Sequence, residues 1–452
     1  MQDLTTGSVA RHLMKTTSFM LVTMVFQTLY FLVDLYWVGR LGKEAVAAVS
    51  LCGNLMFIVL AATQMLGVGT TTLISHAAGR KQVERARLVF NQSLVLGAVV
   101  GGLFGLVGLA VRRPYANGLS ADPLTAALTA DYLLWFIPAM ALQFGIVTMS
   151  SALRGTGNFK PGMVVQTATV ILNIILAPIL IFGWGTGYAF GVSGAAVSTL
   201  VAVAVGTVWL ACYFLPESST LRFVPADWRP QFGLWGDMLK IGLPAGAEFA
   251  LMAVYLFVVY AVSRPFGAAA QAGFGIALRV VQAGFMPVVA LGFSVAPVAG
   301  QNFGAGLADR VRSTFRTAVL LSAVAMLAMF AICQVAPAPL IGFFSADPQV
   351  IAVGEDYLRI VSWTFVFSGV IFVASSMFQA IGNTMPALAA SLVRIVVVAV
   401  PAILLSRVAG FELRWIWYLS VVSITLQMLL QMTLLQRELK RRLTPAMTAT
   451  PA

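Results

Sequence analysis

Two acidic residues lie inside stretches of sequence that are otherwise almost entirely apolar. Asp34 follows Tyr-Phe-Leu-Val at residues 30–33, and Glu248 follows Pro-Ala-Gly-Ala at residues 244–247. The chain has 16 acidic residues, and the remaining ones fall in expected loops, tails or span ends. Burial disfavours the charged form of a carboxylate, so each of these two side chains is suited to exchange a proton, or to bind Na⁺, as its surroundings change.

Four polar residues of the first apolar stretch follow one another at helical spacing: Thr23, Gln27, Tyr30 and Asp34. Steps of four, three and four residues place them on one face of an α-helix. A polar face on a membrane helix is expected against protein or a water-filled cavity, because lipid offers it no hydrogen bonds. We therefore expect Thr23, Gln27 and Tyr30 to line a substrate cleft beside Asp34.

Glu248 has apolar and aromatic neighbours at the same kind of spacing. Met252 and Tyr255 follow it by four and seven residues and so share its helical face. Thioether and aromatic groups suit a pliable pocket for organic molecules. We also expect two arginines inside apolar spans, Arg279 and Arg394, to be buried; each can pair with a carboxylate or brace a helix interface. Arg279 is counted with Met252 and Tyr255 as a cleft residue.

Structural roles for the two acids remain alternatives. Asp34 lies about four residues from the end of its span, roughly 6 Å by helix rise, where it can reach interfacial water or pair with Arg40. Glu248 lies deeper and can make a purely structural hydrogen bond. Neither alternative requires ion coupling.

The composition requires a membrane environment for these residues. Hydrophobic residues make up 60% of the 452-residue chain and charged residues 10%, which does not suit a soluble domain. A helix crosses roughly 30 Å of hydrocarbon at about 1.5 Å per residue. Twelve apolar runs are long enough: 16–38, 46–74, 88–111, 126–150, 162–183, 192–215, 239–262, 269–300, 313–336, 351–381, 386–408 and 412–436. Helix breaks are expected at Gly67, Gly69, Pro287 and Pro297.

The distribution of basic residues predicts the orientation. With the N-terminus inside, the inner segments hold 18 of the 28 Lys and Arg residues and the outer loops hold 8, so both termini are expected in the cytoplasm. The net charge of +12 then reflects topology and contact with the anionic lipid bilayer. No nucleic acid is expected as a partner, because the basic residues form no single patch with interleaved aromatics.

The second half of the sequence repeats the first at a shift of 225 residues. Ser-Ala-Asp-Pro at 120–123 falls on the same tetrapeptide at 345–348, and Gly157-Asn158 falls on Gly382-Asn383. Six spans per half is an even number, so the halves run in the same direction, related by a pseudo-twofold axis along the membrane normal. The predicted fold is an all-α polytopic membrane protein of two six-helix bundles around a cleft. Its expected parts are an N-terminal lobe at 1–215, a linker at 216–238, a C-terminal lobe at 239–436 and a tail at 437–452.

The energy source is expected to be an ion gradient. The sequence contains no G-x-x-x-x-G-K-[ST] phosphate loop, H-E-x-x-H or G-x-S-x-G motif. Its three cysteines are widely separated and suggest neither disulfides nor a metal site. We therefore expect a transporter and not an enzyme, with H⁺ or Na⁺ as coupling ion and no other cofactor.

Three motifs resemble the multidrug and toxic compound extrusion (MATE) family, most closely its bacterial branch of DNA-damage-inducible (DinF-like) members. They are Val-Asp-Leu-Tyr-Trp-Val-Gly-Arg-Leu-Gly at 33–42, Arg-Gly-Thr-Gly-Asn at 154–158 and Gln-Ala-Ile-Gly-Asn at 379–383, the last two each followed by a proline three residues on. The resemblance covers nearly the whole chain. It implies H⁺- or Na⁺-coupled antiport of small organic, often cationic, compounds out through the bacterial inner membrane; we expect a monomer.

The resemblance also carries residues over, position by position. Asp34 matches the family's first-helix aspartate, and Asn173 matches a fifth-helix asparagine that accompanies it, which allows a Na⁺ site near Asp34. One turn after Asn173, where many members have an acidic residue, this chain has Ala177. The ion site of the first half is therefore expected to be reduced.

The seventh helix departs from the family pattern as well. Other members have a glutamate about eight residues after the proline of this helix; here Met252 lies at that distance from Pro244, and Glu248 comes one turn earlier. Phe19 takes the place of the first-helix proline, so helix bending is not expected.

Two alternatives to the antiporter stay open. A lipid-linked oligosaccharide flippase of the same superfamily needs a strongly basic cleft for a pyrophosphate, and only two arginines are expected inside spans. A non-transport membrane scaffold needs no buried carboxylates.

Overall fold

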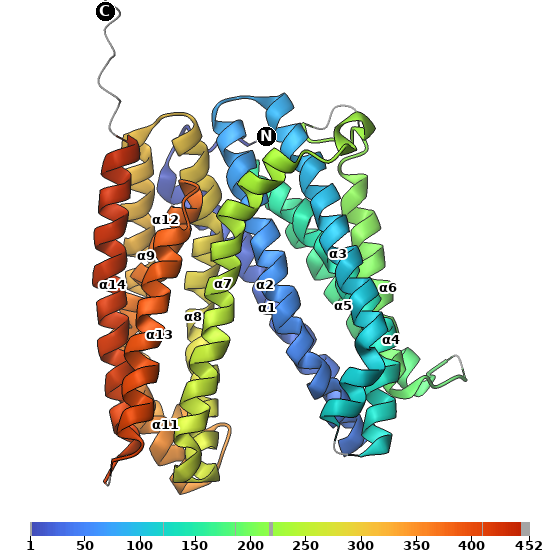
Figure 1. Cartoon of the computed structure of the whole chain (residues 1–452), viewed down its shortest axis with the longest axis vertical. Helices are drawn as coiled ribbons and strands as arrows, with labels where there is room; N and C mark the ends of the chain where they lie inside the picture. Colours follow the sequence, from blue (N-terminus) through green and yellow to red (C-terminus); the bar gives the residue numbers. More distant parts are fainter. Residues whose placement is uncertain (1, 121, 186, 217–219, 409, 444–452) are drawn as a thin grey trace, which may run out of the picture. The chain divides into compact units, whose positions relative to one another are not determined.

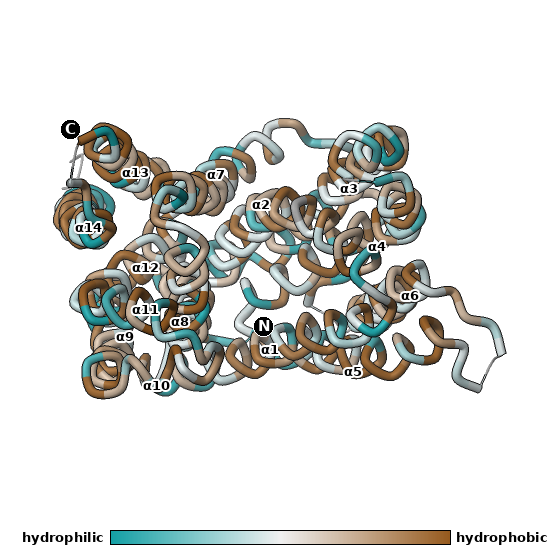
Figure 2. Tube along the Cα trace, turned by 90° about the horizontal axis from the view of Figure 1, so that it is seen from below, coloured by the Kyte–Doolittle hydropathy of each residue, from teal (hydrophilic) through white to brown (hydrophobic). Residues whose placement is uncertain are grey.

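The computed structural model of the chain describes residues 2–443, apart from 121, 186, 217–219 and 409. Within these residues all regular elements are helical, and twelve helices are long and apolar enough to cross a membrane. Hydrophobic residues, brown in Figure 2, predominate along them. The predicted all-α class and its twelve spans are confirmed, and the chain is a multi-pass membrane protein.

The helices form two compact units. Unit 1 consists of Met1–Asp3 and Ser18–Gly246, and unit 2 consists of Leu4–Thr17 and Ala247–Ala452. Within each unit the helices run side by side as a bundle (Figure 1). The first and seventh helices each begin in one unit and continue into the other.

The helices of the first half are α1 (Val9–Gly39), α2 (Lys43–Gly79), α3 (Val83–Leu119), α4 (Pro123–Gly155), α5 (Lys160–Phe182) and α6 (Gly191–Cys212), followed by the 3₁₀ turn η1 (Pro225–Trp228). Those of the second half are α7 (Phe232–Ser263), η2 (Arg264–Phe266), α8 (Ala268–Gly304), α9 (Ala308–Val335), α10 (Pro337–Gly342), α11 (Pro348–Val361), η3 (Ser362–Thr364), α12 (Phe365–Ala380), α13 (Met385–Leu405) and α14 (Leu413–Leu443).

The helix bounds confirm the sequence repeat. α2 and α8 are both 37 residues long. The first residue of α8 lies 225 positions after the first residue of α2, and the same holds for their last residues. Each is preceded by a glycine with positive φ, 114° at Gly42 and 87° at Gly267, a conformation that side-chain-bearing residues rarely adopt. The turns Gly157-Asn158 and Gly382-Asn383 also match, because in each the asparagine N–H bonds the carbonyl five residues earlier.

The two halves differ in one span. α4 is a single helix of 33 residues, whereas its counterpart is divided into α11, η3 and α12. α2 and α8, in contrast, are each a single continuous helix. The breaks predicted within them are therefore wrong, at all four positions: Gly67, Gly69, Pro287 and Pro297. Neighbouring helices of a bundle support a membrane helix around glycine and proline.

The two glycines of α2 permit close packing instead of a break. A Cβ atom at Gly67 would lie 2.9 Å from Ser151 Oγ of α4, and one at Gly69 would lie 2.6 Å from the Met238 carbonyl oxygen of α7. Only glycine fits such an approach without displacing the neighbour. The small residues of α2 thus determine where α4 and the first part of α7 lie in unit 1.

Two adjacent amides on α3 hold the linker. Asn91 and Gln92 make hydrogen bonds of 2.5 to 3.0 Å to backbone and indole groups between Arg222 and Trp235. This part of the predicted linker is thereby fixed to unit 1, and its last residues already belong to α7, which begins at Phe232. Residues 217–219 of the linker lie outside the described residues.

The end of α14 is bound to the turn between α12 and α13. Asn383 Nδ2 donates to Glu438 Oε1 at 2.9 Å, and Arg442 Nη1 donates to the Ile381 carbonyl at 2.8 Å. The predicted tail at 437–452 therefore begins as the last turns of a helix that ends at Leu443. Residues 444–452 lie outside the described residues.

Candidate ion-coupling sites

Asp34 is buried on α1 within unit 1, with 9% of its surface exposed. Its Oδ1 atom is buried and has no hydrogen-bond partner among the described residues. The alternative that it pairs with Arg40 is wrong, because Arg40 Nη2 bonds the Tyr36 hydroxyl and its guanidinium lies 4.8 Å from the centre of that ring. A buried carboxylate oxygen without a donor is costly unless a proton or a cation supplies the missing partner.

Asn173 is joined to the helical turn before Asp34 through a chain of polar groups. The Asn173 amide nitrogen donates to Ser198 Oγ at 3.3 Å and to Thr199 Oγ1 at 3.2 Å, and Thr199 Oγ1 is 3.0 Å from the Tyr30 hydroxyl. The Asn173 Oδ1 atom is buried and has no partner among the described residues. Unit 1 therefore has two buried acceptor oxygens, on Asp34 and Asn173, that lack donors.

The rest of the polar stripe on α1 is less enclosed. Thr23 bonds the Phe19 carbonyl of its own helix at 2.9 Å, which is how a hydroxyl on a membrane helix is often satisfied. Gln27 is exposed. The structure thus connects Tyr30 and Asn173 in one network, whereas among the described residues no hydrogen bond joins Thr23 or Gln27 to it.

Glu248 of α7 accepts two hydroxyl donors in unit 2. Ser391 Oγ of α13 donates to its Oε1 at 3.0 Å, and Ser375 Oγ of α12 lies 3.3 Å from the same atom. Behind the serines, Gln427 Nε2 donates to Ser391 Oγ at 3.1 Å and Gln431 Nε2 donates to Ser375 Oγ at 2.7 Å. The three helices α12, α13 and α14 therefore position this carboxylate through hydroxyl and amide groups.

The remaining cleft candidates of the second half are dispersed. Tyr255 is buried and its hydroxyl lies 3.0 Å from Ser420 Oγ, whereas Met252 is 40% exposed. The Arg394 guanidinium lies 5.0 Å from the centre of the Tyr255 ring, a cation–π arrangement. The expectation that Arg279 is buried is wrong, since this side chain is exposed.

Six residues of the networks around Asn173 and Glu248 were not predicted as site residues: Ser198, Thr199, Ser375, Ser391, Gln427 and Gln431. Ser375 does occur in the sequence repeat, as the counterpart of Ser150. The role of a single hydroxyl or amide inside a helix is hard to predict from sequence, because serine and threonine usually bond the backbone of their own helix. The two glutamines of α14, four residues apart on one helical face, were the detectable signal.

The fold and these sites define a polytopic helical membrane protein with a carboxylate inside a membrane span in each half, Asp34 being buried and Glu248 partly buried. The family model described as MatE matches residues 20–179 and 244–404. The chain belongs to this family. MATE proteins are transporters, so this chain is a transporter and not an enzyme, as expected.

Similar proteins cover most of the chain. A multidrug export protein MepA of Staphylococcus haemolyticus is 27% identical over 83% of this chain and 82% of its own, and a probable multidrug resistance protein YoeA of Bacillus subtilis is 26% identical over 88% and 87%. A solved outward-facing structure of a multidrug resistance MATE family transporter has a TM-score of 0.89 at 23% identity, covering 97% of this chain and 98% of that one. That structure shows a shared fold.

Proposed function

We propose that the chain is a secondary antiporter that exports small organic, cationic compounds in exchange for H⁺ or Na⁺, with Asp34 and Glu248 as the coupling acids. A cleft between two six-helix halves opens alternately to the two sides of the membrane. The protein acts as a monomer in the bacterial inner membrane, with both termini in the cytoplasm and no further cofactor. The names of the MepA and YoeA relatives support drug-like organic compounds as substrates.

One observation carries the ion-coupling proposal. Asp34 Oδ1 and Asn173 Oδ1 are buried in unit 1 without donors among the described residues. A proton on Asp34 or a bound cation removes this deficit, and its release to water restores a charged group that burial disfavours. Whether the site holds a cation therefore depends on how accessible the site is to water.

H⁺ is the favoured ion for this site. Na⁺ prefers several oxygen ligands, and Ala177 stands where a second carboxylate would come one turn after Asn173. Glu248 supplies the second coupling acid. The hydroxyls of Ser375 and Ser391 hold its carboxylate in one orientation in unit 2.

The test is dye efflux from proteoliposomes under an imposed pH or Na⁺ gradient. We expect Asp34→Asn and Glu248→Gln each to abolish gradient-driven efflux, because neither amide can take up a proton at neutral pH. Asp131→Asn and Glu412→Gln make the same substitutions at exposed positions and should retain the parent rate. The gradient that dissipates when substrate is added identifies the ion. Efflux at the parent rate in both buried-site variants contradicts the coupling assignment.

A further inference from the structure

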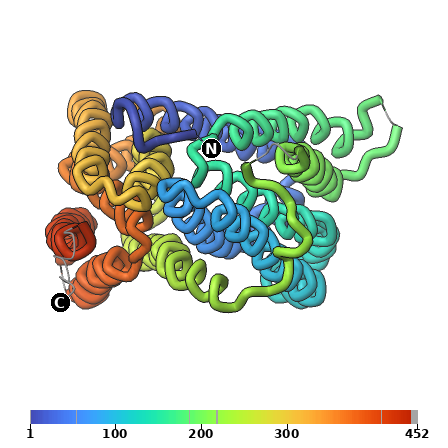
Figure 3. The backbone as a smooth tube through the Cα atoms, turned by 90° about the horizontal axis from the view of Figure 1, so that it is seen from above, coloured from blue at the N-terminus to red at the C-terminus, as the bar shows by residue number. Residues whose placement is uncertain are grey.

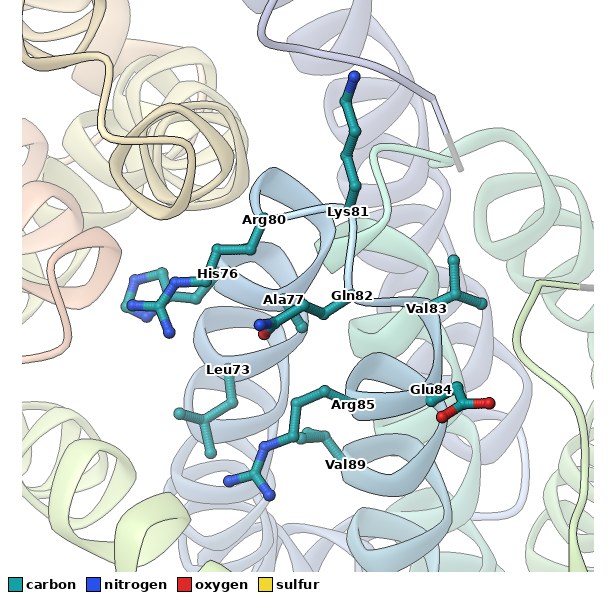
Figure 4. A pocket seen from close by; sticks show the side chains of 10 residues that line it. All are labelled: Leu73, His76, Ala77, Arg80, Lys81, Gln82, Val83, Glu84, Arg85 and Val89. Carbon is teal, nitrogen blue, oxygen red and sulfur yellow. The ribbon is translucent and has the colours of Figure 1, made fainter.

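The turn between α2 and α3 in unit 1 encloses a cavity of about 660 Å³. Four cationic or titratable side chains line it: His76, Arg80, Lys81 and Arg85. In Figure 4 the side chains of His76, Arg80 and Arg85 extend on one side of the helical hairpin, while that of Glu84 lies on the other. The cavity therefore has a positive side that its one lining carboxylate does not neutralise.

Three of the four side chains, those of Arg80, Lys81 and Arg85, have no partner among the described residues. Arg80, Lys81 and Arg85 are exposed, and their side chains make no hydrogen bond or ion pair with any residue that the structure describes. The remaining wall includes the apolar side chains of Leu73 and Val89. A cavity with cationic side chains on one side and apolar side chains on another suits an amphipathic anion.

The sequence repeat relates the turn beside this cavity to a turn of unit 2 that binds a chain segment. A shift of 225 residues maps His76, Ala77 and Arg85 onto Gln301, Asn302 and Arg310 of the turn between α8 and α9. In unit 2 that turn is occupied by the N-terminal segment Leu4–Gly7, which lies beside α8 and α9 in Figure 3.

The contacts of the N-terminal segment show how such a turn binds oxygen atoms. Arg310 Nη1 donates to the Gly7 carbonyl at 3.0 Å and Nη2 to the Leu4 carbonyl at 3.3 Å, while Asn302 Nδ2 donates to the Leu4 carbonyl at 3.2 Å. The Leu4 N–H in turn donates to Gln301 Oε1 at 3.1 Å. The equivalent turn of unit 1 has the matching arginine, Arg85, but among the described residues no chain segment makes a hydrogen bond to its side chain. The described part of the linker is bound farther along α3, by Asn91 and Gln92.

We propose that the cavity at the turn between α2 and α3 binds the phosphate headgroup of an anionic phospholipid, through Arg80 and Arg85 with Lys81 at the rim. At the positions of the uncharged residues Gln301 and Ala305 of unit 2, unit 1 has His76 and Arg80. A negatively charged ligand can therefore take the place that the backbone carbonyls of Leu4 and Gly7 have in unit 2. Arginine binds phosphate oxygens with paired N–H donors.

The size and position of the cavity favour a lipid over free phosphate. A volume of 660 Å³ equals that of roughly 20 water molecules at about 30 Å³ each, which exceeds a single phosphate ion and leaves room for glycerol and the first acyl carbons. The cavity lies where one membrane helix ends, at Gly79, and the next begins, at Val83. In the proposed topology this turn follows the cytoplasmic end of the apolar run 46–74, on the side where anionic headgroups attract basic residues.

Native mass spectrometry of the delipidated full chain tests this site without reference to transport. We expect the parent to bind one phosphatidylglycerol in preference to phosphatidylcholine. The double variant Arg80→Gln/Arg85→Gln should bind phosphatidylglycerol about 30-fold more weakly, since each arginine near a lipid headgroup contributes about fivefold. Arg80→Lys/Arg85→Lys should recover part of the affinity, which separates lost charge from lost fold.

A matched control removes the same charge from the same end of the other half. Arg312 and Arg316 of α9 are exposed, and Arg312→Gln/Arg316→Gln should bind phosphatidylglycerol like the parent. Equal weakening in both double variants means a general charge effect and overturns the site. If inorganic phosphate alone displaces the lipid at millimolar concentration, the site takes free phosphate and the lipid assignment is overturned. Neither result bears on Asp34 or Glu248.

Discussion

Individual side chains define two different environments for the two acids inside membrane spans. Asp34 has a carboxylate oxygen without a donor, whereas Glu248 accepts hydroxyl groups from Ser375 and Ser391. Hydroxyl donors stabilise a charged carboxylate, while an unsatisfied buried oxygen favours the neutral or cation-bound form. In the antiport cycle that we propose, the two acids are therefore expected to load and release their ions at different points.

Asp122 provides a pH-dependent contribution to stability outside the membrane spans. Its side chain caps α4: Thr125 N–H donates to Oδ1 at 2.9 Å and Thr125 Oγ1 to Oδ2 at 2.7 Å. These hydrogen bonds, the backbone one first, lower the pKa of the Asp122 carboxyl below its usual value. A lowered pKa in the folded state means stability that is present above the unfolded-state value and is lost as the pH falls through the folded-state value.

We therefore expect Asp122→Ala to lower the melting temperature of the purified protein at pH 7. The difference from the parent should shrink as the pH is lowered through about 4 towards the folded-state pKa, because the parent then loses its charged cap as well. A thermal melt series across pH measures this. Asp131→Ala, at an exposed position in the same helix, should show no such dependence, and a constant difference for Asp122→Ala would contradict a charged cap.

At the scale of elements, glycines determine how closely helices of unit 1 approach. Gly69→Ala places a Cβ atom 2.6 Å from the Met238 carbonyl oxygen of α7, a backbone atom that cannot rotate away. We expect a loss of about 2 kcal/mol in the free energy of unfolding. Denaturation in mixed detergent micelles, followed by circular dichroism, provides the measurement.

Gly102→Ala is the matched control for Gly69→Ala. Gly102 also lies inside a membrane helix, α3, but a Cβ atom there meets nothing within 4 Å. Alanine should be neutral or should stabilise this helix by about 0.5 to 1 kcal/mol. An equal loss in both variants would show that helix flexibility, and not the contact with α7, accounts for the effect.

The elements were more predictable from sequence than their contacts. The spans could be located because roughly 20 apolar residues are needed to cross a bilayer. The repeat placed Asp122 and Asp347 at equivalent positions, and the structure shows that each caps the start of a helix. Breaks at Gly67 and Pro287 were wrongly predicted, because local propensity gives way to packing when neighbouring helices support the backbone. The network around Glu248 depends on α12, α13 and α14, whose residues lie more than 100 positions away in the sequence.

At the scale of the whole molecule, the N-terminal segment is a structured part of unit 2. Leu4 is 1% exposed, and Arg310 bonds carbonyl groups of Leu4, Thr6 and Gly7. Arg310 is itself oriented by Asn302, whose Oδ1 accepts from its Nε at 2.8 Å. α1 begins directly after this segment and continues into unit 1, so the segment fixes the start of the helix that bears Asp34.

We expect Arg310→Gln to release the N-terminal segment. Hydrogen bonds from a charged donor contribute about 1.5 to 3 kcal/mol each, so loss of even one should raise the hydrogen exchange rate of the Leu4–Gly7 amides at least about tenfold. Exchange detected by mass spectrometry measures this. Arg312→Gln removes an exposed arginine that pairs with Asp309 and should leave exchange of the segment unchanged; protection retained in Arg310→Gln would contradict the assignment.

The exact register of the repeat also has a historical meaning. The glycine turns and capped helix starts occur at equivalent positions in both halves, but the position equivalent to Asp34 is Val259 and the position equivalent to Glu248 is Thr23. The two halves therefore share the positions of their turns and helix starts, but not the positions of these two acidic residues. Duplication of a six-helix unit accounts for the shared turns, and the two copies now carry their ionisable groups at different positions of that common scaffold.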